Sequence, residues 1–232
     1  MKENQLLNKL LAFDTPTVSN VVGTFPNQET CLGLYNPWEV NWYTDERLHC
    51  IFPEHGRRAG YVVTAVYGMP DSYHRLDFVD ILHAIEEAPG PVILCIKQNF
   101  PEEIRRKNGL LGGNMLTAYK KMGVCGILTD GPSRDLEEIR PLGVQCMFTG
   151  VSPAHGAFSV QAVNVPVNIC GMDVCPGEIV HMDENGAIKF GAKYLEKVVE
   201  NAEILSEKEE KKQKAMWEAE TAEELAELMK KK

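Results

Sequence analysis

Two short segments of the chain carry residue types suited to binding and catalysis. The first is Gly112-Gly113-Asn114-Met115, which directly precedes a predicted helix. Glycine lets a ligand approach the backbone closely, and the free N–H groups at a helix start can bind an anion. A glycine pair before a helix is also common in ordinary tight turns, so this segment alone is weak evidence for a binding site.

The second segment, residues 129–135, reads Thr-Asp-Gly-Pro-Ser-Arg-Asp and follows a predicted buried strand. Open α/β sheets bind ligands at the carboxyl ends of their strands. Arg134 provides a planar fork that suits a carboxylate, and Asp135 provides a hard oxygen for Mg²⁺ or Mn²⁺. The alternative is structural: Asp135 caps the next helix, and Arg134 pairs with Asp135 or Glu137.

Together the two segments supply what is needed to hold a 2-oxo acid. An arginine and backbone amides bind its carboxylate, and a metal ion on Asp135 binds its keto oxygen. Polarisation of that oxygen stabilises the enolate that forms when a C–C bond next to a pyruvate unit breaks. No lysine in an obviously apolar pocket suggests a Schiff base, which favours the metal-dependent route. Lys97 and Lys120 are secondary candidates for anion contacts, with a surface role as the simpler interpretation.

The elements that must position these segments alternate between strands and helices. Apolar β-branched runs predict strands, and a 3.6-residue periodicity predicts helices. Strands are predicted at 61–67, 91–96, 124–129 and 144–148, and helices at 78–87, 115–122 and 136–140. This alternation predicts βαβ units around a parallel-rich central sheet. Nearer the start, Thr15 as the cap and Pro16 in the first helical position predict another helix.

Other regions depart from this alternation. Residues 24–57 are rich in Pro, Asn, Gly and aromatic residues without a clear period, which predicts a long irregular excursion. Residues 158–169 and 178–190 predict further strands, with an Asn-Gly hairpin turn in the second segment. The end of the sequence is helical and rich in Glu and Lys. It carries an apolar stripe formed by Val198, Val199, Ala202 and Leu205. We therefore expect an α/β domain at 1–191 and a charged helical tail at 192–232, which lies on a neighbouring surface or another subunit.

The composition argues against several classes of partner. The chain has 232 residues and a formal net charge of −9. An acidic chain with no basic tract is poorly suited to nonspecific nucleic-acid binding, which needs Lys and Arg against phosphates. No apolar run approaches the ~20 residues that span a bilayer, and the polar start has no signal-like core. The seven cysteines include no CxxC pair, which argues against zinc and predicts free thiols. We expect a cytoplasmic protein with no membrane or nucleic-acid partner.

Three sequence blocks also resemble a known family. They are Gly112-Gly113-Asn114-Met115, the segment 123–135 (GVCGILTDGPSRD) and the segment 174–186 (VCPGEIVHMDENG), and the opening TPTVSN at 15–20 is similar as well. The order and spacing of these blocks resemble the RraA-like family over about residues 11–190. That family includes class II 4-hydroxy-4-methyl-2-oxoglutarate/4-carboxy-4-hydroxy-2-oxoadipate aldolases and regulators of ribonuclease E activity.

The resemblance implies a fold and an assembly. The fold is an α/β/α sandwich with a parallel-rich swivelling central sheet, assembled as a homotrimer or as a hexamer of paired trimers with active sites between subunits. The matching positions would bind substrate through the backbone amides of Gly112, Gly113, Asn114 and Met115. The resemblance assigns the pyruvate carboxylate to Arg134 and the metal to Asp135. Enzymes of the family also decarboxylate oxaloacetate through the same enolate.

The chain departs from the family pattern in three places. The usual early Ser-Asp is Ser19-Asn20, the usual Pro-Gly-Asp ends in Glu178, and the stretch 24–60 is longer than usual. Members that only bind ribonuclease lack the Arg-Asp pair, which this chain keeps. The resulting hypothesis is a Mg²⁺- or Mn²⁺-dependent lyase that releases pyruvate from a 4-hydroxy-2-oxo di- or tricarboxylate. The alternatives are a non-catalytic regulatory protein and a lyase for a different 2-oxo acid. The general base is unassigned, and His74 and His155 are the histidines of interest.

Overall fold

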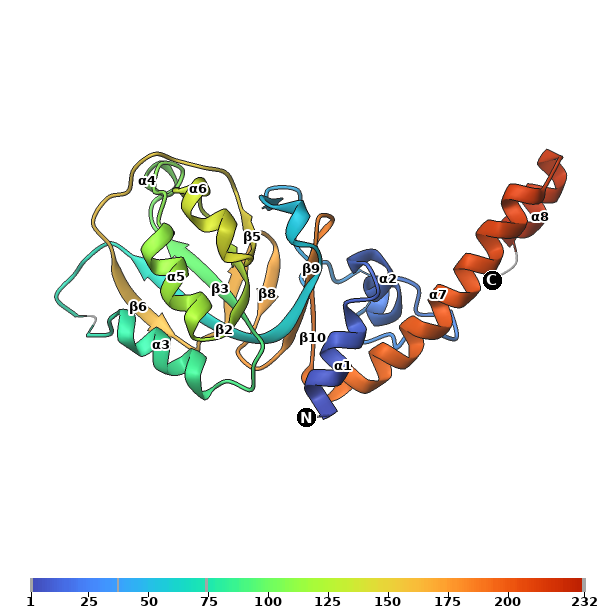
Figure 1. Ribbon diagram of the computed structural model, residues 1–232, viewed down its shortest axis with the longest axis horizontal. Helices are drawn as coiled ribbons and strands as arrows, with labels where there is room; N and C mark the ends of the chain where they lie inside the picture. The colour runs from blue at the N-terminus through green and yellow to red at the C-terminus, as the bar shows by residue number, and fades with distance from the viewer. Residues whose placement is uncertain (1, 37, 74, 231–232) are drawn as a thin grey trace.

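A mixed eight-stranded sheet forms the centre of the computed structural model, which describes residues 2–36, 38–73 and 75–230 (Figure 1). The strand order is β1-β5-β4-β3-β2-β9-β10, and β6 pairs with β2. The run β2-β3-β4-β5 is parallel and the remaining pairings are antiparallel. The bounds are β1 His49–Cys50, β2 Arg58–Gly68, β3 Val92–Asn99, β4 Val124–Thr129, β5 Gln145–Phe148, β6 Ser159–Val163, β9 Ile179–Asp183 and β10 Gly186–Phe190. The predicted parallel-rich α/β architecture is confirmed.

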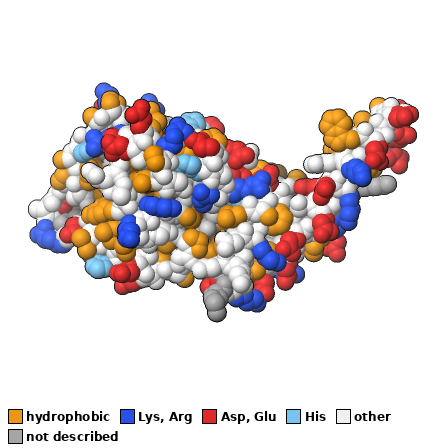
Figure 2. Space-filling model, in the orientation of Figure 1, with side chains coloured by type: hydrophobic (Ala, Val, Ile, Leu, Met, Phe, Trp, Pro, Cys, Tyr) orange, Lys and Arg blue, Asp and Glu red, His pale blue; other side chains and the backbone are white. Residues whose placement is uncertain are grey.

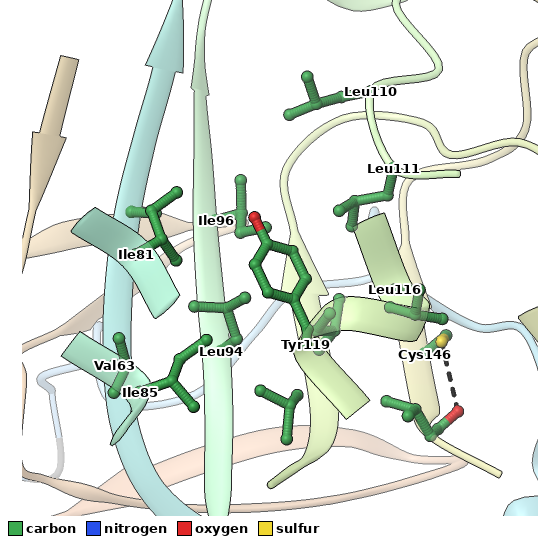
Figure 3. Packing of buried hydrophobic residues seen from close by; sticks show 14 of the residues in the cluster. Val63, Ile81, Ile85, Leu94, Ile96, Leu110, Leu111, Leu116, Tyr119 and Cys146 are labelled. Carbon is green, nitrogen blue, oxygen red and sulfur yellow. Dashed lines mark hydrogen bonds between the residues drawn. The ribbon is translucent and has the colours of Figure 1, made fainter. Parts of the chain in front are cut away.

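Helices cover one face of the parallel strands. They are α3 (Phe78–Glu87), α5 (Gly113–Lys121) and the short α6 (Leu136–Ile139), and α4 (Glu102–Arg105) follows β3. Tyr119 of α5 is fully buried against Leu94 and Ile96 of β3 and against Ile81 and Ile85 of α3 (Figure 3). Ile81 and Ile85 form the inward face of α3, and this packing fixes the position of the α5 N-terminus over the sheet.

The opposite face of the sheet curves around a second apolar cluster. Val62, Ile93 and Leu128 point into it, because side chains alternate between the two faces of a strand. A separate two-stranded ribbon, β7 (Val167–Ile169) and β8 (Met172–Val174), packs on this cluster. The helices on one face and this ribbon on the other leave the central strands buried on both faces.

A second group of helices packs on the end of the sheet formed by β2, β9 and β10. It contains α1 (Lys2–Leu10), α2 (Thr15–Ser19), the π-helical turn Asn20–Thr24 and the first half of α7 (Leu195–Glu218). The predicted apolar stripe is buried here: Val198, Val199, Ala202 and Leu205. Beyond Leu205, α7 leaves the body of the molecule, and α8 (Ala222–Lys230) lies against its far end (Figure 1).

The structure differs from the prediction at two local points. Asp14 caps α2 through a bond from the Thr17 N–H (2.8 Å), whereas Thr15 was expected to do so. Thr15 instead lies inside the helix, where its N–H and hydroxyl bond to β9. The segment 158–169 is divided between two sheets, because Asn164 has a left-handed backbone (φ 52°) and Pro166 donates no hydrogen bond.

Among its described residues, the excursion at 24–57 is irregular as predicted, apart from the last residue of the π-helical turn, β1 and a 3₁₀ turn at Pro53–His55. The seven cysteines are free thiols. Within the part of the chain that the structure describes, no helix combines the length and apolar character needed to cross a bilayer.

Candidate active site

The two segments singled out from the sequence lie side by side. Gly112 precedes the first turn of α5, and Arg134-Asp135 connect β4 to α6. The backbone of Arg134 donates to the Leu111 carbonyl (3.0 Å), and the Ser133 hydroxyl donates to the same carbonyl (2.6 Å). These bonds hold the β4–α6 loop against the residues that enter α5, although the segments are about twenty residues apart in the chain.

The Asp135 carboxylate meets the start of α5. Its Oδ2 accepts a hydrogen bond from the Gly113 N–H (3.2 Å) and lies 3.4 Å from Arg134 Nε. A carboxylate at a helix N-terminus is stabilised by the positive end of the helix dipole. The arrangement therefore places one carboxylate, one guanidinium and a helix start within contact distance of one another.

The backbone of Asp135 rules out the capping alternative. Asp135 is left-handed (φ 58°, ψ 42°), and its side chain makes no capping bond to α6. Its carbonyl oxygen begins α6 instead, by accepting from the N–H groups of Glu138 and Ile139. A left-handed non-glycine residue costs roughly 1–2 kcal/mol, and such strain concentrates at functional sites.

Both glycines face close contacts within the protein. A Cβ added to Gly112 would collide with Asp135 Oδ2 and lie 3.1 Å from Arg134 Nε. A Cβ added to Gly113 would collide with the carboxylate of Glu138. These close contacts come from the β4–α6 loop and from α6, whereas the close approach by a ligand that the sequence predicts stays a prediction.

Arg134 has unused capacity to bind an anion. Its side chain is about one third exposed (35%), and Nε is buried without a hydrogen-bond partner among the described residues, because the nearby Asp135 oxygen is poorly aligned. A buried donor of this kind is costly unless a ligand or water satisfies it. A carboxylate bound by the guanidinium and by the N–H groups of α5 would do so.

Asp135 is the carboxylate that this site offers to a hard divalent cation. Among the residues that the structure describes, no group of three or more His, Cys, Asp or Glu side chains could hold a metal. Mg²⁺ commonly binds through one or two carboxylates and keeps several waters, and Mn²⁺ accepts similar oxygen ligands. Asp135 with water is such a set, and Glu138 lies close enough to Gly113 to be a second carboxylate at the site.

Asn114 and Met115 point elsewhere. They line an apolar cavity of about 540 Å³ beside α5, with Tyr67, Phe78 and Phe158 among its walls. The four residues of the glycine segment are therefore divided, since Gly112 and Gly113 contact the Arg-Asp loop and the next two border this cavity. Sequence reasoning missed the cavity because its walls come from four distant segments.

Neither His155 nor His181 belongs to the arrangement of Gly113, Arg134 and Asp135. His155 is exposed, and its Nδ1 lies 2.8 Å from the Gly156 carbonyl, while His74 falls outside the described residues. His181 is fully buried on β9, with Nδ1 bonded to the Thr15 hydroxyl (2.9 Å). Burial lowers the pKa of His181 to about 4, so the ring is neutral at physiological pH.

Comparison with known proteins defines the family. The model of the RraA-like family (Aldolase/RraA) matches residues 39–188, well over half of the chain. The chain belongs to the RraA-like family.

This RraA-like chain is 34% identical over 110 residues to an uncharacterized protein of Methanocaldococcus jannaschii, covering 47% of the chain and 53% of that protein. It is 30% identical over 83 residues to the 4-hydroxy-4-methyl-2-oxoglutarate aldolase of Thermus thermophilus, covering 35% of the chain and 51% of that protein. The chain thus spans about half the length of these relatives.

Solved structures share the RraA-like fold. Streptomyces coelicolor RraAS2, described as an unusual member of the RNase ES inhibitor RraA family, has a TM-score of 0.66 at 21% identity, covering 89% of the chain and 94% of that protein. An uncharacterized protein from Pseudomonas syringae has a TM-score of 0.73 at 17% identity, covering 96% and 93%. At these identities the likeness establishes the fold alone.

Proposed function

We propose that this RraA-like chain is a Mg²⁺- or Mn²⁺-dependent lyase. Its substrate is a 4-hydroxy-2-oxo di- or tricarboxylate, which it cleaves by a retro-aldol reaction to release pyruvate, and it decarboxylates oxaloacetate as a side reaction. The observation that carries the proposal is the contact of the Asp135 carboxylate with Gly113 N–H, beside a guanidinium whose Nε has no hydrogen-bond partner.

Each part of this arrangement has a role in the proposed reaction. Arg134 and the N–H groups at the start of α5 bind and orient the substrate carboxylate. Asp135 holds the cation, which, when bound, polarises the 2-keto group. The left-handed backbone and the contact with Gly113 keep the Asp135 carboxylate on the substrate side of the loop.

The bond changes are those of a retro-aldol cleavage. The 4-hydroxyl loses its proton, the C3–C4 bond breaks, and its electron pair passes to C3 as the enolate of pyruvate, which is then protonated at C3. The base is unassigned. Oxaloacetate reaches the same enolate when its C3–C4 bond breaks and CO₂ leaves, which is why both reactions are expected of one site.

The relatives support the aldolase part of this proposal. The Thermus thermophilus relative is named as a 4-hydroxy-4-methyl-2-oxoglutarate aldolase, and a relative from Halalkalibacterium halodurans is named as a putative one. The matched regions are partial, so the substrate is our proposal. We further propose a cytoplasmic homotrimer or hexamer, from the family resemblance.

The test measures pyruvate released from 4-hydroxy-4-methyl-2-oxoglutarate and from oxaloacetate. Each assay is run with Mg²⁺, with Mn²⁺ and after chelation, for the unmodified protein and for Asp135→Asn. We expect metal-dependent turnover that the variant lacks. Turnover of oxaloacetate alone would retain the mechanism and change the substrate. The absence of turnover with a folded protein would refute the assignment for these two substrates.

A regulatory protein on the same scaffold is the second candidate. The observation that favours it is the projecting arm formed by the end of α7 and by α8, where Trp217 is 90% exposed. Figure 2 shows acidic and basic side chains mixed along this arm. A regulator should act equally well after chelation of the metal, whereas the proposed lyase should lose its activity. Chelation therefore distinguishes the two candidate functions.

A further inference from the structure

A polar cavity, distinct from the apolar one beside α5, lies at the carboxyl ends of β3 and β4. It has a volume of about 390 Å³, and neither Arg134 nor Asp135 lines it. Four cationic side chains line it: Arg47, Lys97, Arg105 and Arg106. Two carboxylates, Glu102 and Asp130, also belong to its walls. This concentration of positive groups contrasts with the net charge of −9 of the whole chain.

Asp130 holds two of these cations in place. Its side chain is almost fully buried, and Oδ2 accepts from Lys97 Nζ (2.6 Å) and from Arg105 Nη1 (3.2 Å). Oδ1 accepts from the Gln98 N–H (2.7 Å), and Lys97 also donates to the Asn168 carbonyl (3.2 Å). One buried carboxylate therefore fixes two cations, which reduces the conformational entropy that a ligand would have to overcome.

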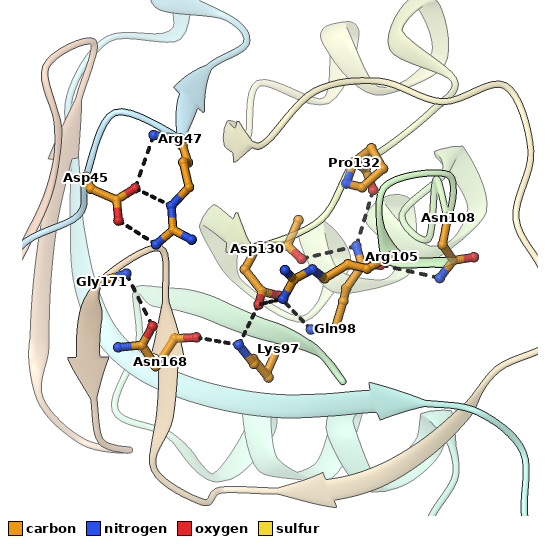
Figure 4. A network of polar contacts seen from close by, with 11 residues as sticks. Asp45, Arg47, Lys97, Gln98, Arg105, Asn108, Asp130, Pro132, Asn168 and Gly171 are labelled. Carbon is orange, nitrogen blue, oxygen red and sulfur yellow. Dashed lines mark hydrogen bonds and ion pairs between the residues drawn. The ribbon is translucent and has the colours of Figure 1, made fainter. Parts of the chain in front are cut away.

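Arg47 reaches the cavity from the irregular excursion at 24–57. Its guanidinium donates two hydrogen bonds to the Asp45 carboxylate, from Nε (2.9 Å) and from Nη2 (2.5 Å). Figure 4 shows the guanidinium groups of Arg47 and Arg105 approaching the same region from opposite sides, with Lys97 beside Asp130. Arg106 directly follows α4 and pairs with Glu102, the first residue of that helix. The cations thus come from three separate segments, the excursion, β3 and the loop that contains α4.

We propose that this cavity binds the phosphate group of a small phosphorylated molecule. A planar carboxylate can be satisfied by a single arginine fork, whereas a tetrahedral phosphate accepts hydrogen bonds from several directions at once. Four cationic groups that arrive from three segments match the second geometry. Thr149 and His49 also line the cavity and supply further polar groups. The site is separate from the proposed lyase centre and does not depend on that function.

Calorimetric titration with inorganic phosphate and pyrophosphate tests the proposal on the full chain at low ionic strength. Malonate and citrate serve as carboxylate probes, and sodium chloride controls for ionic strength. Arg47→Gln removes the charge and keeps a donor for Asp45, and Arg105→Gln does the same for Asp130. Arg140→Ala is the matched control, because Arg140 is similarly exposed and paired with a single carboxylate, Glu54.

We expect saturable binding of phosphate and tighter binding of pyrophosphate. Each glutamine variant should weaken binding about tenfold, as expected for loss of one charge-assisted contact. Arg140→Ala and Arg134→Ala should leave it unchanged, and thermal melting shows whether the variants fold. Three results would overturn the proposal: no saturable binding of either phosphate probe, tighter binding of malonate or citrate than of phosphate to Arg134→Ala, in which the proposed lyase centre is disabled, or phosphate binding that is lost in Arg134→Ala and retained in Arg47→Gln.

Discussion

The carboxylate of Asp135 accepts a hydrogen bond from the backbone N–H of Gly113, although Asp135 stands at the start of a different helix, α6. The left-handed backbone of Asp135 makes this possible, because it turns the side chain away from α6. The two helices α5 and α6 therefore meet at one carboxylate. The proposed lyase centre depends on that contact, and two features of the sequence favour it: Gly112, whose added Cβ would collide with Oδ2, and a residue at 135 that tolerates a positive φ.

Asp135→Asn should abolish metal-dependent pyruvate release while leaving the fold intact. Asparagine tolerates the left-handed conformation and can still accept from Gly113, but it has no charge with which to hold a cation. We expect activity to fall at least about 100-fold, in line with the loss of a central catalytic group. Urea unfolding should give a free energy within about 0.5 kcal/mol of the parent. Asp135→Ala, which lacks the tolerance for positive φ, should lose about 1 kcal/mol.

Gly112→Ala should impair the site by displacing the Asp135 carboxylate. The added methyl group would collide with Oδ2 and displace it, so we expect pyruvate release to fall at least about tenfold, since small misplacements of catalytic groups are costly. Gly156→Ala is the matched control, because nothing lies within 4 Å of its added Cβ. Equal activity of the two variants would show that the contact between Gly112 and Asp135 has no part in catalysis.

His181 should make the protein less stable in mild acid. Its pKa is lowered to about 4 from 6.5 in the folded state because the ring is buried, so the unfolded chain binds the proton first. Burial of neutral His181 therefore contributes fully to the free energy of unfolding above about pH 6.5, and this contribution is lost as the pH falls toward 4. The shift corresponds to about 3 kcal/mol.

Urea unfolding between pH 7.5 and 4 measures this dependence. His181→Gln should flatten the pH profile, whereas His83→Gln, at an exposed position, should retain the slope of the parent. An unchanged slope in His181→Gln would assign the acid sensitivity to the carboxylates of the protein.

The projecting arm should be dispensable for the fold. Deleting residues 206–232 removes exposed helix and the exposed Lys208–Glu29 pair, which is worth about 0–1 kcal/mol. We expect the unfolding free energy to change by no more than about 1 kcal/mol. Leu205→Ala, within the buried half of α7, should cost about 2–3 kcal/mol, and Leu225→Ala on the arm less than about 0.5 kcal/mol. Light scattering on the truncated chain will reveal whether the arm also joins subunits. An assembly with fewer subunits than the full chain forms would contradict a purely peripheral role.

The sequence by itself determined the elements and the residue types of the candidate site. The apolar run that forms β3 and the periodic pattern of α3 are local properties, because burial on both faces of a strand or on one face of a helix requires such patterns. The same holds for the stripe on the first half of α7. The boundary between the α/β domain and the tail remains a prediction, as do the roles of Arg134 and Asp135.

Only the tertiary structure decided where the side chains point. A local interpretation allowed Asp135 to cap α6, and the contact with Gly113 became visible only once α5 was in place. Likewise, Thr15 was expected to cap α2, but β9 supplies closer partners for it in His181 and Asp183. The cationic cavity requires Arg47 and Lys97, fifty residues apart, to meet. Such contacts join distant segments, and their geometry follows from how the sheet, the loops and the helices pack, which no local pattern of residues encodes.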